Sequence, residues 1–288
     1  MTPFARTGAH SGRGSRGGLN RGLTYLALVL LCLQAFGPLV WMALGSLKSD
    51  TEFYTNIWGL PTSLTLRNYP DAWEEGNAGT YLTNSLMVVA LGLAILLVVC
   101  ILAGYALARL DFPGRSVIFG MVLATMMIPP DILTTPLFVV TRNLGILGNQ
   151  WTLSLIYASA GFGLSTFLMR GYFMSIPREL EESALIDGAG TLRTLWSVIM
   201  PLARPGILTV AILQGMAMWN DLYLAFVFLR RPEQATIPIG MLGFFQKYSV
   251  QWPLLCAALL LTSIPVILLY FLAQKWFVRG MTAGAVKG

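Results

Sequence analysis

Several stretches of the sequence are apolar and free of charge over a length that can span a lipid bilayer. The first of them, residues 22–47, holds no Asp, Glu, Lys or Arg. In a helix that rises about 1.5 Å per residue, such a run exceeds the roughly 30 Å hydrocarbon core of a membrane. A cleavable signal peptide has an apolar region of only about 7 to 15 residues. The run therefore predicts a retained membrane-spanning helix.

Five further stretches extend this pattern along the chain. Two of them contain one acid each, Asp131 in the third span and Asp221 in the fifth, which we expect to be a single helix passing through that residue. The expected spans are residues 81–108, 116 to about 140, 143–169, 205–229 and 249–274. Together they predict an all-α, polytopic membrane protein with six transmembrane helices, in a domain that covers residues 22–276.

The composition excludes a soluble fold of this size. Hydrophobic residues make up 56% of the chain and charged residues 11%, whereas soluble domains average about 45–50% and about 25%. The formal net charge of +6 does not indicate nucleic-acid binding, because the basic residues lie between the apolar runs and form no stripe with aromatic platforms. Membrane lipid is the partner that this composition predicts.

The distribution of Lys and Arg predicts the orientation, because cytoplasmic loops carry the excess of positive charge. With six spans, the two termini and the second and fourth connections share one side. Thirteen basic residues lie on that side: Arg6, Arg13, Arg16, Arg21, Arg109, Arg115, Arg170, Arg178, Arg193, Arg204, Lys275, Arg279 and Lys287. The remaining six lie opposite: Lys48, Arg67, Arg142, Arg230, Arg231 and Lys247. Both termini are therefore expected to be cytoplasmic.

This topology divides the chain into segments. Residues 1–21 form a basic tail that we expect to be disordered, and residues 277–288 form a C-terminal cytoplasmic tail. Residues 48–80 form an external loop, whose aromatic residues are interpreted either as interfacial anchors or as contacts to an external partner. Residues 170–204 form a long cytoplasmic loop.

The cytoplasmic loop predicts a short helix with defined ends. Pro177 suits a first helical position, acids in the first turn complement the helix dipole, and Gly188 suits a left-handed C-terminal cap. Pro201 and Pro205 indicate a bend before the fifth span. Such a helix could lie on lipid headgroups, but four acids would be repelled by an anionic leaflet, which favours a protein partner.

The same loop resembles a known motif. The residues Glu182-Ser-Ala184, then Gly188, then Val198-x-Met-Pro201 resemble the EAA motif of permease subunits of binding-protein-dependent ABC importers. The family has Ala, Ile and Leu where this chain has Ser183, Val198 and Met200. Residues 23–288 as a whole are similar to the carbohydrate-uptake branch of that family. Supporting stretches occur at 46–48, 64–69, 84–86, 105–115, 127–129, 219–220 and 280–288.

The resemblance implies a type I importer permease fold in the inner membrane and an alternating-access mechanism for a sugar or sugar-like solute. It implies four partners: a second homologous permease, an ATPase subunit dimer, an external solute-binding protein and the carbohydrate-like solute. It further implies that the acidic helix is a coupling helix on the ATPase and that the C-terminal tail runs along the ATPase dimer interface. The residues concerned are Glu179, Glu182, Ser183, Ala184, Asp187, Gly188 and Pro201 in the loop, and Gly284 and Lys287 in the tail.

The energy source is expected to lie outside this chain. The sequence has no Gly-x-x-x-x-Gly-Lys-[Ser/Thr] phosphate-binding loop, so ATP and Mg²⁺ are assigned to the partner ATPase and no cofactor to this chain. The only histidine, His10, lies in the basic tail, and we expect no catalytic residue, no metal site and no enzymatic activity. The alternatives are an ion-coupled secondary transporter or channel, which needs several ionisable groups at membrane depth, and a structural subunit without a solute path.

The fifth span carries the polar sequence Trp219-Asn220-Asp221. These residues are interpreted either as solute contacts in the transport path or as a hydrogen-bonded cluster that orders the helices, and the sequence leaves both open. In the third span, Pro129, Pro130 and Pro136 predict a broken helix that lines a cavity or acts as a hinge.

Overall fold

The computed structural model describes residues 14–245 and 250–285, with side-chain surroundings from residue 21 to residue 271 outside the gap. It is built from helices, and the one β pairing among these residues is an isolated bridge between Phe245 and Val250. Among the described residues, five helices are long and apolar enough to cross a membrane, and a bent pair brings the number to six if it is counted as one span. The prediction of an all-α protein with six spans is confirmed.

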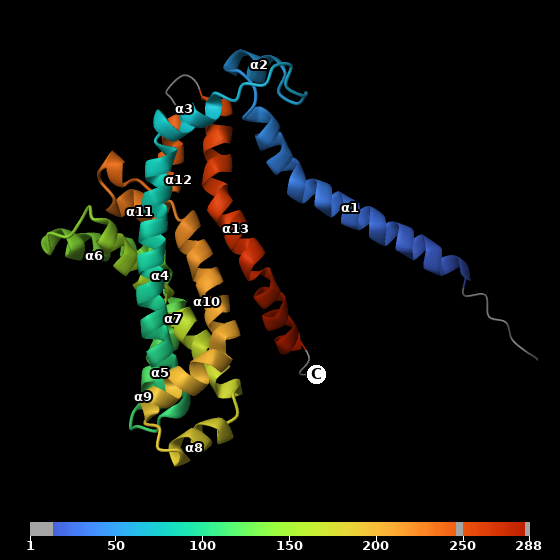
Figure 1. Cartoon of the computed structure of the whole chain (residues 1–288). Helices are drawn as coiled ribbons and strands as arrows, with labels where there is room; N and C mark the ends of the chain where they lie inside the picture. The colour runs from blue at the N-terminus through green and yellow to red at the C-terminus, as the bar shows by residue number, and fades with distance from the viewer. Residues whose placement is uncertain (1–13, 246–249, 286–288) are drawn as a thin grey trace, which may run out of the picture.

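Helix α1 (Gly14–Gly45) stands apart from the other helices. Every residue from 21 to 40 is exposed, and Figure 1 shows the helix leaving the bundle diagonally from its C-terminal end. The helix begins inside the tail predicted for residues 1–21. Residues 14–20 contain no proline, so the hydrogen-bond ladder of the spanning helix can continue into them. Residues 1–13, and with them His10, lie outside the described residues.

The predicted external loop has structure of its own, with α2 (Asp50–Thr55) and α3 (Asn68–Glu74). It is organised around Lys48, whose side chain is buried at 1% exposure. The Lys48 Nζ donates to the carbonyl oxygens of Asn56 and Ile57, which follow the C-terminal end of α2. The amide of Asn68 bonds to the carbonyl oxygens of Ser46 and Lys48, at 2.8 Å each. The loop is thereby fastened to the C-terminal end of α1.

Helices α4 (Ala78–Arg109) and α7 (Gln150–Ser175) form the centre of the bundle. Small residues let their backbones approach closely, as is usual in membrane helices. A Cβ on Gly104 would lie 2.9 Å from the Cβ of Met169, and one on Gly161 would lie 2.9 Å from a methyl group of Leu96. The two helices therefore pack as a close pair over much of their length.

The third span is broken, as its prolines predict. Helix α5 (Arg115–Met127) and helix α6 (Pro130–Asn143) are bent by 98° with respect to each other. Ile128 is extended between them, and Pro130 opens α6 at a first-turn position, where its missing N–H costs no hydrogen bond. In Figure 1, α6 turns sideways out of the bundle.

The loop predicted to be cytoplasmic contains α8 (Glu179–Ile186) and α9 (Thr191–Thr194), followed by a π-helical segment, Leu195–Ile199, and then by α10 (Met200–Asn220). Pro201 lacks the N–H that would donate to a carbonyl in the preceding turn, and the wide turn before it accommodates that loss. Helix α10 continues through Pro205.

The C-terminal part follows with two short helices and one long one. These are α11 (Tyr223–Phe228), α12 (Ile237–Met241) and α13 (Trp252–Ala285), with 3₁₀ turns at Pro232–Gln234 and Leu242–Phe244. Helix α13 runs beyond residue 276, so residues 277–285 of the predicted C-terminal tail are helical.

Candidate functional site

Helix α8 lies at one end of the bundle, and the structured external loop with α2 and α3 lies at the other (Figure 1). Every residue of α8 is exposed or half-buried. Three acids, Glu179, Glu181 and Glu182, occupy its first turn, where a carboxylate interacts favourably with the positive end of the helix dipole. The helix thus presents an acidic surface away from the membrane-spanning part.

The C-terminal end of α8 is fixed by Gly188. Its φ of +82° lies in the left-handed region, which residues with a Cβ disfavour. The N–H of Gly188 donates to the carbonyl of Leu185 at 3.0 Å, and the N–H of Ala189 donates to that of Ala184 at 2.9 Å. These two bonds form a Schellman motif. The predicted left-handed cap is therefore present at the predicted residue.

The structure gathers most of the loop residues singled out from the sequence on one exposed element. Glu179, Glu182, Ser183, Asp187 and Gly188 are exposed, and Ala184 is half-buried. Pro201 lies apart, at the start of α10. There it lines a groove of about 430 Å³ with Trp196, Met200, Arg204, Ile207 and Leu208.

A buried ion pair attaches α8 to the bundle, and the sequence analysis did not select it. The Arg109 Nε lies 2.8 Å from the Glu181 Oε1, with side-chain exposures of 5% and 13%. Arg109 also donates to the carbonyl of Ile176, the residue that follows α7. Burial raises the pKa of Glu181, and the positive charges of Arg109 and Arg178 oppose that rise. The sequence features that could have indicated this pair were an arginine at the end of a long apolar run and one glutamate among the four acids of the loop.

The break at Asp221 corrects the expectation of one continuous fifth helix. Helix α10 ends at Asn220 and α11 begins at Tyr223. One carboxylate oxygen of Asp221 accepts from the Tyr157 hydroxyl at 2.8 Å and from the Ala225 N–H at 3.0 Å. The side chain therefore caps α11 and ties it to α7.

Asn220 and Trp219, the residues before Asp221, lie in surroundings that differ from those of Asp221. Asn220 is exposed, and its amide donates to the carbonyl of Met216 in its own helix at 2.8 Å. Trp219 is half-buried and lines an apolar groove of about 240 Å³ between α4, α10 and α13. The three residues predicted for a solute path therefore do not converge on one polar cavity in this conformation.

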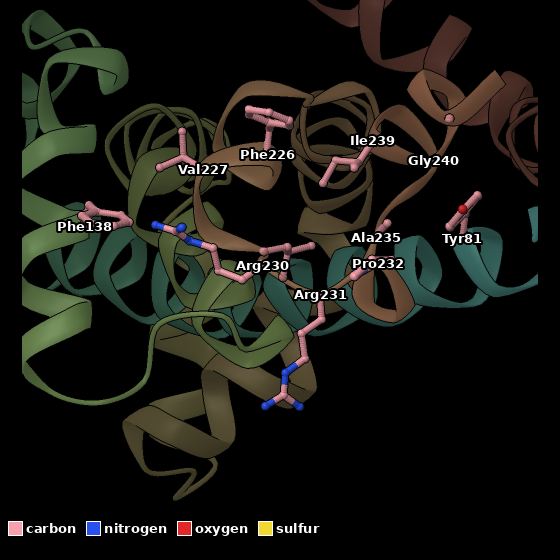
Figure 2. Close-up of a pocket in the computed structure, with 12 residues that line it drawn as sticks. Tyr81, Phe138, Phe226, Val227, Arg230, Arg231, Pro232, Ala235, Ile239 and Gly240 are labelled. Atoms are coloured by element: carbon pink, nitrogen blue, oxygen red, sulfur yellow. The ribbon is translucent and has the colours of Figure 1, made fainter. Parts of the chain in front are cut away.

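A larger cavity is lined by residues of α4, α6, α11 and α12 and was not foreseen from the sequence. Its volume is about 610 Å³. Figure 2 shows the Arg230 side chain extending toward the Phe138 ring, while that of Arg231 points away from the other labelled residues. The Arg230 guanidinium carbon lies 5.2 Å from the ring centroid, within range of a cation–π contact. Tyr81, Phe226 and Ile239 are among the apolar residues of the lining.

The remaining sequence-predicted site residues lie at the C-terminus. Gly284 falls in the last turn of α13, and Lys287 lies outside the described residues. Within the described part of the chain, no group of three or more His, Cys, Asp or Glu residues could hold a metal ion.

Comparison with known proteins gives consistent matches over almost the whole chain. Residues 100–283 match the family described as binding-protein-dependent transport system inner membrane component. The maltodextrin transport system permease MdxG of Bacillus subtilis is 36% identical over 94% of this chain and 97% of its own. The sulfoquinovosyl glycerol transport system permease SmoH of Agrobacterium fabrum is 35% identical over 92% of this chain and 94% of its own.

Solved structures share the fold. One chain of a bacterial ABC transporter that imports the acidic polysaccharide alginate superposes with a TM-score of 0.83 at 25% identity, covering 96% of this chain and 100% of that one. A chain from an alginate ABC transporter in complex with an alginate pentasaccharide-bound periplasmic protein gives a TM-score of 0.60 at 16% identity, over 91% of this chain and 96% of that one.

Proposed function

The chain belongs to the family of binding-protein-dependent transport system inner membrane components, and we propose from this that it is the permease subunit of an ATP-driven ABC importer for a sugar or sugar-like solute. It is a multi-pass protein of the inner membrane. Its relatives MdxG and SmoH serve maltodextrin and sulfoquinovosyl glycerol transport, and both align over more than nine tenths of their length. A carbohydrate-like solute is the class common to these names.

The observation that carries the coupling role is α8. An acidic, exposed helix with a rigid glycine cap lies at one end of the bundle, opposite the external loop. We assign its exposed surface, around Glu179, Glu182, Ser183, Asp187 and Gly188, to a cleft of a cytoplasmic ATPase. Ala184 and Pro201 support that surface from the helix and from the start of α10. In this orientation both chain termini are cytoplasmic.

The mechanism proposed is alternating access. ATP and Mg²⁺ bind to a dimer of separate ATPase subunits, whose closure moves α8 and the helices attached to it. This chain contributes the movable path and no catalytic step. A second, homologous permease completes the path, an external solute-binding protein delivers the solute, and the segment with Gly284 and Lys287 runs along the ATPase dimer.

An ion-coupled secondary transporter is not favoured. Such a transporter uses several ionisable residues at membrane depth. Among the described spans, Asp131 lies in the first turn of the sideways helix α6, and the Asp221 carboxylate accepts two hydrogen bonds within the bundle. A reversible proton or ion site would have to compete with those bonds.

Copurification tests the proposal. The tagged chain is isolated in mild detergent as wild type, as Gly188→Val and as Gly190→Val. Both variants add the same atoms where an added Cβ meets nothing within 4 Å, but Gly188 has a φ of +82° and Gly190 one of −71°. We expect wild type and Gly190→Val to recover an ATPase and a second permease, and Gly188→Val to lose the ATPase.

Recovery of the ATPase with all three proteins would place the contact away from the α8 cap. If a well-folded wild type recovers no ATPase, the importer assignment is contradicted and the ion-coupled secondary transporter becomes the favoured function.

A further inference from the structure

The cytoplasmic end of α4 is unusually rich in arginine contacts. Arg115 donates to the carbonyl oxygens of Leu107 and Ala108, both at 2.9 Å, and Arg170 donates to that of Leu107 at 3.1 Å. These two side chains satisfy the terminal carbonyls of α4 and place positive charge at the negative end of its dipole. Arg109, the last residue of the helix, is not needed for that purpose.

Arg109 instead joins three elements. Its guanidinium contacts Glu181 in the first turn of α8 and the carbonyl of Ile176 at the end of α7. The other two salt bridges within the described part of the chain are local i, i+4 pairs, Arg67–Asp71 and Arg115–Asp111, each with at least one strongly exposed partner. The Arg109–Glu181 pair is the one that connects segments far apart in the sequence, and both of its side chains are largely shielded from water.

A shielded ion pair is poor evidence for a stabilising role. Removing two charges from water costs about as much as their attraction returns, and apolar replacements of similar volume are often neutral or stabilising. Separating the two side chains would leave an unpaired buried charge on each. This penalty keeps the two elements in a single relative arrangement. Such a pair suits a rigid connection better than it suits general stability.

The opposite end of α4 holds residues 233–237 by hydrogen bonds. The Asn84 amide donates to the carbonyl oxygens of Glu233 and Ala235 at 2.8 and 2.9 Å, and the Ile237 N–H donates to the Ser85 hydroxyl at 2.8 Å. Between its two ends, α4 runs uninterrupted for 32 residues, which is about 48 Å of helix. It therefore touches the α8 loop at one end and residues 233–237 at the other.

Packing makes α4 suited to move as one body with α7. The rings of Tyr105 and Phe173 meet edge to face at 5.7 Å, one turn from Arg109. Gly104 lets α4 approach Met169 and the backbone of Arg170 so closely that an added Cβ would lie 3.1 Å from the Arg170 nitrogen. A displacement delivered at Arg109 cannot be absorbed by loose contacts at this end.

We propose that Arg109 and Glu181 form the link through which movement of α8 reaches α4, and that α4 carries this movement to the outer segment 233–237. Arg109 is in this sense a positioning residue: it touches neither nucleotide nor solute. The proposal rests on the function proposed above, because it requires that an ATPase moves α8.

The test uses the complete transporter, with its ATPase, second permease and binding protein, reconstituted in lipid. Spin labels are placed at Trp58→Cys and Glu233→Cys, two exposed positions on the outer loops, after the three native cysteines are replaced by serine. The distance between the labels is measured without nucleotide and with ATP, Mg²⁺ and vanadate. Glu181→Gln removes the negative charge that pairs with Arg109, and Asp111→Asn, which removes an exposed ion pair near the same end of α4, is the matched control.

We expect the nucleotide to change the label distance in wild type and in Asp111→Asn. Glu181→Gln should retain its ATPase subunits and hydrolyse ATP but lose the distance change. The double variant Arg109→Met/Glu181→Leu separates coupling from stability: it should recover thermal stability and still lack the distance change.

A full distance change in Glu181→Gln would overturn the proposed link. A distance change in the apolar double variant would also overturn it, because the pair would then be a purely structural contact. Loss of the ATPase from Glu181→Gln would also overturn it, because Glu181 would then belong to the docking surface. An absent distance change in a wild type that retains its ATPase refutes the movement itself, whereas a wild type without ATPase refutes the proposed function.

Discussion

Asp221 can be assigned to structure or to solute contact by measuring stability. One of its carboxylate oxygens accepts from the Tyr157 hydroxyl and from the Ala225 N–H in the first turn of α11. A hydrogen bond between membrane helices contributes on average about 0.6 and at most about 1.7 kcal/mol, and loss of a helix cap costs about 0.5–2 kcal/mol. Asp221→Ala should therefore lower the free energy of unfolding by about 1–4 kcal/mol. Tyr157→Phe should lower it by only the first of these amounts.

The assay is thermal or denaturant unfolding of the purified chain in mild detergent, arranged as a double-mutant cycle. Because Tyr157 acts through Asp221, Tyr157→Phe should cost little in the Asp221→Ala background, whereas independent roles would make the two losses add. Asp221→Asn keeps one acceptor oxygen and should fall between wild type and Asp221→Ala. Equal stability of Asp221→Ala and wild type would refute the capping role and leave solute contact as the reason for this carboxylate.

Three further changes test the packing, the outer loop and the buried pair. Gly104→Ala overpacks the close approach of α4 to Met169 and should destabilise the chain by about 1–3 kcal/mol, whereas Gly171→Ala, in open space on α7, should be neutral or stabilising by about 0.4–1 kcal/mol in the same unfolding assay. Lys48→Met leaves two carbonyls without their donor and should cost about 1–3 kcal/mol, read as faster proteolysis of residues 48–69. Burial raises the pKa of Glu181 above its ordinary value of 4.5, so the folded state keeps this proton to a higher pH than the unfolded chain does. The contribution of Glu181 to stability should then fall as the pH rises from its unfolded pKa through its folded pKa, and this contribution to the pH dependence should be absent in Glu181→Gln.

The spans could be predicted from sequence because the property that places a helix in a membrane is local. A run such as residues 81–108 without a charge is apolar in any conformation, and transfer into lipid depends on that run alone. The cap of α8 was equally accessible. A left-handed residue at a helix end strongly favours glycine, and Gly188 follows an acidic first turn at the right distance.

The residues that connect elements could not be predicted, because each depends on a partner brought near by folding. Glu181 differs from Glu179 and Glu182 only in facing Arg109, which is 72 positions earlier in the chain. The outer cavity is similar. Phe138 lies in the third span and Arg230 in the loop after the fifth, and the sequence of neither segment indicates that the two residues meet.

The two broken spans show most clearly the difference between features with a local cause and features with a tertiary cause. The break between α5 and α6 has a local cause, since Pro129 and Pro130 cannot both continue a helix, and the sequence predicts it. The break before α11 has a tertiary cause. Nothing near Asp221 prevents a helix, but the Tyr157 hydroxyl from α7 and the first turn of α11 share its carboxylate. Irregular backbone at membrane depth persists only where protein or water satisfies it, and here part of that satisfaction comes from Tyr157 of α7, which the sequence of the fifth span does not contain.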